Sequence, residues 1–435
     1  MSKEFGKHVR GGPPATEKFD MAKKARPLQW QFAVFLWPFA KIRNWTHLTK
    51  IKKHGTKGLK PPFILLCNHN AMYDFYVMFP ATAPHRGIIP SAVDNYIARD
   101  HLLRQFGTVP KRKYTADIGI LRTCRQALKD NKFFGIYVEA RYSLCGLTEI
   151  IPDSVGQMIK HMGVPVVTLT CRGHHINDPF WGDHHSRFVL HTEADMTLAF
   201  TAEELKTKTP DEINKRIKEL LYNDDFKWQS EKRIKVKYKK RAEGLHRVLY
   251  QCPHCKTEYQ MSSKYDKVFC KACGKEWTLN YYGELEGNDG VTEFKYPSDW
   301  YCWEREMVRK EIDDGTYYLE TDVDVNDLPN KKGFIHMGKG KLIHDMTGLH
   351  LKGVRDYDGV PFEMELDAKG QYAVHIEYNY RFGNWRDCVD MSTIDDTWYV
   401  FPESKDCSVT KISLATEEMF KSIWENKKQN AEVTK

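Results

Sequence analysis

The sequence predicts an α/β fold: a mainly parallel β-sheet with flanking helices, followed by a small cysteine-rich module and a β-rich C-terminal domain. Three features support this prediction. Short apolar runs alternate with helical stretches between about residues 61 and 200. Two CxxC pairs lie close together within residues 251–283. From about residue 300 onward, aromatic and β-branched runs are separated by Gly, Asp and Asn, which is typical of strands joined by turns.

The first of these regions shows the alternation most clearly. Apolar runs at 62–67, 133–138 and 164–170 predict buried strands, whereas apolar residues at helical spacing predict helices over 116–130 and 154–162. Strands that alternate with helices indicate βαβ units and a parallel sheet. In such sheets the working residues lie in loops beyond the carboxyl ends of the strands. That edge is therefore where a functional site is expected.

The length of 435 residues allows two or three domains. The segment "ATEEMFKSIWENKK" is predicted to form a terminal helix, because Thr416 and acidic residues lie at its start and lysines lie at its end. We expect a basic flexible tail at 1–27, an amphipathic segment at 28–60, an α/β domain at 61–225 closed by one or two helices at 203–223, a basic linker or helix at 226–250, a metal-binding ribbon at 251–283, and a β-rich domain with a terminal helix at 284–435.

Positive charge is concentrated at the N-terminus. The net charge is +8, but residues 1–60 hold 14 Lys and Arg against three Asp and Glu, a local charge of +11, so the remainder sums to −3. Such a segment favours an anionic partner surface, either lipid or nucleic acid.

Residues 28–45 form the most apolar stretch of this region, and they include Trp30, Trp37 and Trp45. The stretch is shorter than the roughly 18–20 apolar residues that span a bilayer. Tryptophans and flanking basic residues are typical of a helix at the headgroup level of a membrane. The alternative is a helix that packs on the core of the protein itself. No small-residue cleavage site follows this stretch, so a signal peptide is not expected. The chain holds eleven cysteines without a secretory signal, which indicates a reducing compartment.

The first predicted strand leads directly into "CNHNAMYDFY" (67–76), where polar side chains follow the apolar run. At a strand-to-helix turn the chain can curl so that His69 and Asp74 meet. A histidine of near-neutral pKa is the usual general base, and a carboxylate on its other ring nitrogen fixes its tautomer. A structural loop histidine is the alternative, because H-x4-D alone is a weak signal.

The stretch "NHNAMYD" (68–74) resembles the NHxxxxD motif of the glycerolipid acyltransferases, specifically the 1-acylglycerol-3-phosphate (lysophosphatidate) acyltransferase family. Three further stretches resemble family blocks in the same order: "FGTVPKRK" (106–113), "GIYVEARYS" (135–143) and "VPVVTLT" (164–170). The resemblance covers roughly residues 60–200. The 135–143 block departs from the family's Phe-Pro-Glu-Gly-Thr-Arg-Ser pattern, since Arg141 stands in place of its threonine and Tyr142 in place of its arginine.

The resemblance implies acyl transfer, with His69 as general base and Asp74 as its orienter. It also implies residues that bind the acyl acceptor or its phosphate: Lys111, Arg112, Lys113, Glu139, Arg141 and Ser143. The acyl donor would be acyl-CoA or acyl carrier protein, and the acceptor a lysophospholipid, most simply 1-acylglycerol-3-phosphate. Because Arg141 and Tyr142 depart from the pattern, another lipid alcohol is the alternative acceptor. A peripheral place on the inner, cytoplasmic face of the membrane follows from these partners.

The cysteine module has the spacing CxxC, fourteen residues, CxxC, with Cys252, Cys255, Cys270 and Cys273 as the four thiols. Four thiolates in two such pairs suit a tetrahedral Zn²⁺ site that is structural, because it has no open position. Such ribbons also bind nucleic acid, and the run 231–241 holds seven basic residues and one acidic residue. A nucleic-acid-binding or scaffold protein is therefore an alternative of another class. We do not favour it, because the aromatic and acidic side chains of the ribbon do not form a basic face.

Several histidines follow the stretch 164–170, near Cys171. They are His174, His175, His184, His185 and His191. Their spacing matches no metal site with a known mechanism, so we expect them at the surface or at the rim of a cleft.

Overall fold

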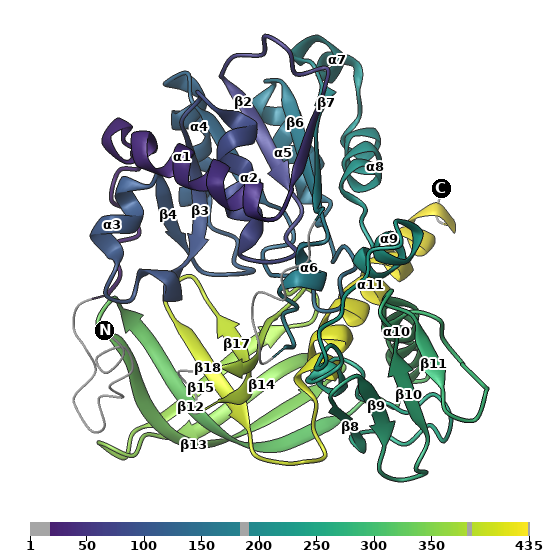
Figure 1. Ribbon diagram of the computed structural model, residues 1–435. Coiled ribbons are helices and arrows are strands. Elements are labelled where there is room, and N and C mark those ends of the chain that lie inside the picture. Colours follow the sequence, from purple (N-terminus) through teal and green to yellow (C-terminus); the bar gives the residue numbers. More distant parts are fainter. Residues whose placement is uncertain (1–17, 183–190, 381–384, 434–435) are drawn as a thin grey trace.

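The computed structural model describes residues 18–182, 191–380 and 385–433. The predicted tail lies mostly outside these residues, as do His184 and His185. Figure 1 shows two large sheets, one above the other, with a small sheet at the side of the lower one. The predicted mixed α/β architecture with a β-rich C-terminal part is confirmed.

The upper sheet has seven strands in the order β1-β7-β6-β2-β5-β3-β4. All its pairings are parallel except β6 with β7, which is antiparallel. Its strands, in chain order, are β1 (Lys50–His54), β2 (Phe63–Cys67), β3 (Gly87–Ala92), β4 (Thr108–Lys111), β5 (Phe133–Tyr137), β6 (Val166–Arg172) and β7 (Glu193–Phe200).

The helices around this sheet begin and end at residues that the sequence marks. The Asp117 carboxylate accepts the Gly119 N–H at 2.7 Å and caps α4 (Ile118–Lys129), and Gly163 ends α5 (Ser154–Met162) with a left-handed φ of 63°. The predicted closing helix at 203–223 is two helices, α7 (Ala202–Thr207) and α8 (Pro210–Leu221), because Thr209 and Pro210 start a new one. The remaining short elements are α2 (Tyr73–Thr82), η1 (Val93–Tyr96), α3 (Asp100–Gln105), α6 (His174–Asn177), α9 (Asp225–Glu231) and η2 (Leu245–Arg247). The last two lie in the segment predicted as a basic linker or helix.

The lower part is antiparallel throughout. A four-stranded sheet carries the cysteine module, and α10 (Pro297–Asp313) leads from it to a seven-stranded sheet of order β15-β14-β13-β12-β18-β17-β16. The predicted terminal helix is α11 (Val409–Val433), which crosses between the parts (Figure 1). The strands are β8 (Met261–Lys264), β9 (Lys267–Cys270), β10 (Glu276–Leu279), β11 (Leu285–Gly287), β12 (Leu319–Asn330), β13 (Gly333–Asp345), β14 (Gly348–Val354), β15 (Pro361–Asp367), β16 (His375–Tyr380), β17 (Arg386–Ser392) and β18 (Thr397–Pro402).

One apolar core joins these parts. It runs from Leu144 and Ile176 below the upper sheet through the cysteine module and α10 into the large antiparallel sheet. In Figure 1 that sheet lies below the upper sheet, across from the ends of its parallel strands. The β-rich domain is therefore a second wall of the region in which a functional site is expected.

The predicted N-terminal helix is α1 (Trp30–Thr46), which packs against α2. It buries Ala33, Ala40 and Asn44 and leaves a row of large apolar side chains exposed. These are Trp30, Val34, Phe35, Phe39, Ile42 and Trp45. Within the described residues, no helix combines the length and the hydropathy that a bilayer crossing requires.

Candidate active site

His69 and Asp74 meet at the turn between β2 and α2, as their spacing predicts. His69 follows the buried strand and Asp74 lies in the first turn of the helix, with 3.3 Å between His69 Nδ1 and Asp74 Oδ2. The Asp74 side chain is 1% exposed and that of His69 is 18% exposed. One partner is therefore enclosed, while the other reaches a cavity.

Donors surround the Asp74 carboxylate. Oδ2 also accepts the backbone N–H groups of Asn70 at 2.6 Å and Ala71 at 3.1 Å, and Oδ1 forms a short hydrogen bond with His174 Nδ1. Burial opposes ionisation, but the bonds from His174 and His69 outweigh it and hold the pKa of Asp74 well below its ordinary value. Asp74 is thus an ionised acceptor that favours a proton on Nδ1 of His69.

No sequence pattern singled out His174, and the position at the surface or the rim of a cleft that was predicted for it and for His175 is wrong. Both are fully buried, because the turn after β6 folds beneath the turn after β2. His174 lies one hundred residues from Asp74 in the chain, so local spacing could not reveal the contact. Its place just beyond the carboxyl end of a parallel strand was the one usable signal.

Two tyrosines hold the imidazole of His69. The Tyr137 ring is stacked on it at 4.0 Å between centroids, and the Tyr142 ring is tilted against it at 4.4 Å. Burial lowers the pKa of His69 below its ordinary value of 6.5, Asp74 opposes this shift, and the charge of Lys113 adds to it. The side chain is therefore a neutral base at pH 7, with Nδ1 occupied by Asp74 and Nε2 available.

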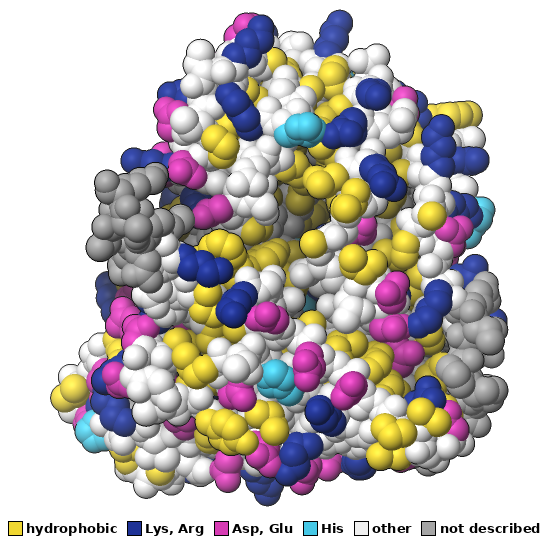
Figure 2. Space-filling model, turned by 180° about the vertical axis from the view of Figure 1, so that it is seen from behind, with side chains coloured by type: hydrophobic (Ala, Val, Ile, Leu, Met, Phe, Trp, Pro, Cys, Tyr) yellow, Lys and Arg dark blue, Asp and Glu magenta, His cyan; other side chains and the backbone are white. Residues whose placement is uncertain are grey.

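His69 borders a cavity of about 1450 Å³. Figure 2 shows a hollow on the back of the molecule with hydrophobic walls. The apolar walls come from α1, α2 and the sheet, and they include Phe32, Phe35, Leu36, Phe39, Phe75 and Ile89. The exposed face of α1 therefore continues into the cavity that reaches His69.

Glu139, predicted to bind the acceptor, is instead fully engaged with the backbone. Its Oε1 accepts the His69 N–H at 2.8 Å and its Oε2 accepts the Glu149 N–H at 2.7 Å. Burial raises the pKa of Glu139 to about 8. The side chain thus fixes the backbone that carries His69, and it does not border the cavity.

Arg141 and Ser143 also make contacts within the protein. The Arg141 guanidinium pairs with Glu149 at 2.6 Å and with Glu417 of α11 at 2.5 Å, and it donates to the Ser413 hydroxyl at 2.6 Å. The Ser143 hydroxyl donates to the Leu147 carbonyl at 2.6 Å. Arg141, in the 135–143 block, therefore joins the upper part of the molecule to α11.

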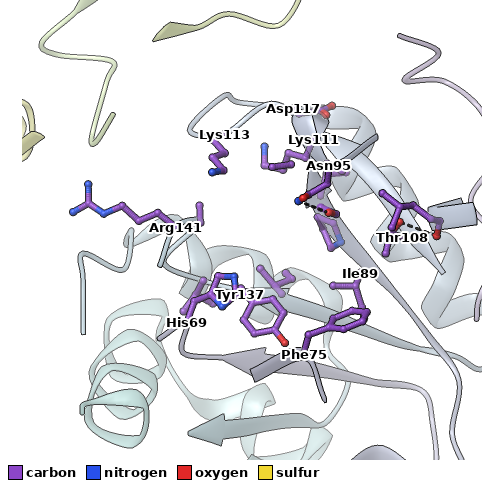
Figure 3. A pocket seen from close by; sticks show the side chains of 18 of the residues that line it. His69, Phe75, Ile89, Asn95, Thr108, Lys111, Lys113, Asp117, Tyr137 and Arg141 are labelled. Carbon is purple, nitrogen blue, oxygen red and sulfur yellow. Dashed lines mark hydrogen bonds between the residues drawn. The ribbon is translucent and has the colours of Figure 1, made fainter. Parts of the chain in front are cut away.

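The three basic residues of the stretch 106–113 face different parts of the structure. Lys111 and Lys113 border the cavity, and Figure 3 places them together, across from His69 and Tyr137, with Arg141 extending away. Arg112 is buried against the β17–β18 turn, where it donates to the carbonyls of Ile394 and Asp395 and to Thr397. Arg112 therefore binds the β-rich domain and does not face the cavity.

The four predicted zinc ligands converge. Sγ atoms of Cys252 and Cys273 lie 3.8 Å apart, as do those of Cys255 and Cys270, and all four lie within 4.8 Å of one another. A tetrahedron with metal–sulfur bonds of about 2.3 Å has edges of about 3.8 Å. The four thiols therefore fit a zinc ion.

No protein-family profile matches this chain, and no curated protein does. Among solved structures it is similar to the 1-acyl-sn-glycerophosphate (LPA) acyltransferase PlsC from Thermotoga maritima. The two share 16% sequence identity over 43% of this chain and 76% of that chain, with a TM-score of 0.36. Because the superposition is this loose, we base the functional proposal on the side chains of the site.

Proposed function

We propose that this protein is an O-acyltransferase that moves a fatty acyl group from a thioester to the hydroxyl of a lysophospholipid. The observation that carries the proposal is the His69–Asp74 pair at the edge of a large apolar cavity. A base that is neutral at pH 7 can take a proton from an alcohol, and an apolar cavity can hold an acyl chain.

The reaction follows from the protonation states of the pair. Nε2 of His69 takes the proton of the acceptor hydroxyl while its oxygen forms a bond to the thioester carbonyl carbon. Asp74 keeps the other proton on Nδ1 and stabilises the imidazolium that forms. The tetrahedral intermediate then breaks its carbon–sulfur bond, and the imidazolium returns the proton to the leaving thiolate. The products are an ester and a free thiol.

The membrane is the proposed source of the acceptor. The exposed apolar row on α1 lies beside the cavity and follows the basic N-terminal segment, an arrangement suited to the headgroup level of an anionic bilayer. We propose that the protein is peripheral on the cytoplasmic face and that lipid enters along α1. Acyl-CoA and acyl carrier protein are both consistent with a thioester donor.

The first candidate acceptor is 1-acylglycerol-3-phosphate, which would give phosphatidate. Lys111 and Lys113 lie across the cavity from His69, where their charge suits a phosphate. Because Tyr142 replaces the family's arginine and Arg141 is paired with Glu149 and Glu417, a different lipid alcohol is the second candidate.

We also propose that Cys252, Cys255, Cys270 and Cys273 hold a structural Zn²⁺ ion. A closed set of four thiolates leaves no position for a substrate, so the ion would act on folding alone. The module shares its core with α10 and the large antiparallel sheet. Loss of zinc is therefore expected to destabilise the lower part of the molecule.

The test is a mass-spectrometric assay for phosphatidate with lysophosphatidate in detergent and either acyl-CoA or acyl carrier protein thioester. His69→Ala should lower product formation by at least about 10²-fold, the usual effect of removing a general base. His161→Ala is the matched control, since His161 borders the same cavity near α5, away from Asp74. Unchanged activity in His69→Ala would overturn the mechanism, and product only from other lipid alcohols would reassign the acceptor.

A further inference from the structure

A second cluster of ligand-type side chains lies in the β-rich domain. His375 and Glu377 are two residues apart on β16, and Asp390 on β17 pairs directly with His375. Side chains at i and i+2 of one strand and at the opposite position of its partner share one face of the sheet. All three therefore point to the same side.

The cluster is buried and compact. His375, Glu377 and Asp390 side chains are 1%, 16% and 3% exposed, and one ligand atom from each lies within 4.8 Å of the others. His375 Nε2 lies 2.8 Å from Glu377 Oε1 and 3.7 Å from Asp390 Oδ2. Two carboxylates and an imidazole nitrogen thus converge on one point, and Glu377 also borders the cavity.

The only cationic side chain in contact with this cluster, within the described residues, is Lys113 from the loop after β4. Its ammonium lies 2.5 Å from His375 Nε2 and 3.9 Å from Glu377 Oε1. One ammonium cannot neutralise two buried carboxylates. Asp390 has only the Cys388 thiol, at 3.7 Å, as a hydrogen-bond donor in the part of the chain that the structure describes.

With Lys113 and Glu377 both charged, the contacts of His375 Nε2 have no consistent assignment of protons. If Nε2 carries a hydrogen toward Glu377, that hydrogen also faces the Lys113 ammonium. If Nε2 is bare, its single lone pair accepts from Lys113, and Glu377 at 2.8 Å has no donor from the ring. A protonated Glu377 would compete with Lys113 for the same lone pair. A cation that binds all three acceptors removes the conflict.

We infer that His375, Glu377 and Asp390 form a binding site for a divalent transition-metal ion. One imidazole and two carboxylates suit Mn²⁺, Fe²⁺ or Zn²⁺, and three protein ligands leave positions open on the cavity side. Lys113 would be displaced from the cluster when the ion binds. This site is separate from the four thiols of the cysteine module, and it does not depend on the proposed acyl transfer.

The experiment is a titration of the full-length protein with Mn²⁺, in which electron paramagnetic resonance measures free Mn²⁺. Mn²⁺ prefers oxygen and imidazole ligands, so the thiolate module does not compete. We expect one Mn²⁺ per chain. His375→Gln and Asp390→Asn should each weaken binding at least about tenfold because each removes a ligand. Glu363→Gln is the matched control, since Glu363 lies on β15 at the far edge of the same sheet, 72% exposed.

Lys113→Met tests the same site with the ligands intact. Removing the competing ammonium should tighten Mn²⁺ binding by about tenfold, since the ion no longer has to displace a positive charge that lies 3.9 Å from Glu377 Oε1. This variant also decides the question if either ligand variant fails to fold, as judged by its circular dichroism. No bound Mn²⁺ at millimolar concentration, or an affinity that neither Lys113→Met nor the ligand variants change, would overturn the inference.

Discussion

Two clusters of histidine and carboxylate face the same region from opposite walls, and they differ in how their charges are satisfied. In the upper sheet, Asp74 has four donors, of which two are backbone N–H groups of the turn before α2. In the lower sheet, Glu377 and Asp390 share one lysine that comes from the other wall.

The difference follows from the local backbone. At a strand-to-helix turn the backbone N–H groups of the turn residues have no ladder partner, so they can bind a carboxylate in the first turn of the helix. In an antiparallel ladder the N–H groups bind the neighbouring strand, and only side chains can serve a carboxylate. The carboxylate of the first cluster is therefore satisfied by its own turn and by two histidines, whereas the second cluster requires a cation from outside.

Replacing Asp74 by Asn breaks the first cluster at its centre and should have the largest effect. An uncharged Asn no longer stabilises the imidazolium of His69, and its amide N–H meets either the backbone N–H groups of Asn70 and Ala71 or the Nδ1–H of His174. We expect about a 10²-fold loss of kcat/KM in the phosphatidate assay. Asp117→Asn is the control, since Asp117 borders the cavity but caps α4. Activity near the wild-type level in Asp74→Asn would mean that the pair does not act as a base and its orienter.

Arg141 tests whether the two walls form one structure. Its guanidinium is fully buried between Glu149 and Glu417, so Arg141→Gln leaves two buried carboxylates with one fewer cation. We expect the free energy of unfolding to fall by about 3–5 kcal/mol in denaturant titrations. Arg122→Gln on the exposed face of α4 should leave it nearly unchanged. Equal stability of the two variants would mean that α11 is held by its apolar contacts alone.

Local patterns were sufficient for three of the seven strands of the upper sheet, β2, β5 and β6. They were also sufficient for the His69–Asp74 pair, because β2, the turn and α2 are contiguous in the chain. The four cysteines were likewise found from spacing. His174 and Arg112 were misplaced because their contacts join segments one hundred to almost three hundred residues apart. The His375 cluster was missed because only the pairing of β16 with β17 places Asp390 beside His375. Arg141 shows the same limit. Its position in the motif suggested a ligand for phosphate, whereas its guanidinium pairs with Glu417 of α11.

His174 is the next test of the first cluster, with a smaller expected effect. His174→Gln removes one of four donors to Asp74 and leaves the contact between Asp74 and His69 in place. We expect kcat to fall by about tenfold and the acid limb of its pH profile to move, because Asp74 is then less firmly held. His175→Gln is the neighbouring buried control, which lies on the far side of α6 against Trp181. A fall in kcat with an unmoved pH profile would indicate a structural role for His174 alone.

The pH dependence of the proposed activity in the wild-type protein is the smallest expected effect, and it separates the two clusters most directly. Burial lowers the pKa of both His69 and His375, and the charge of Lys113 adds to both shifts. Asp74 opposes the shift of His69, and the pKa of His375 lies well below its ordinary value. Asp74 is ionised throughout, and Glu139, with a pKa of about 8, changes charge only on the alkaline side. A single acid limb should therefore report His69. Because the base acts when neutral, kcat/KM should be level near pH 7, fall through a midpoint below 6.5, and drop about tenfold for each unit below that midpoint. A midpoint above 6.5 would mean that Asp74 stabilises the imidazolium of His69 more than burial opposes it, which the contacts of the first cluster do not support.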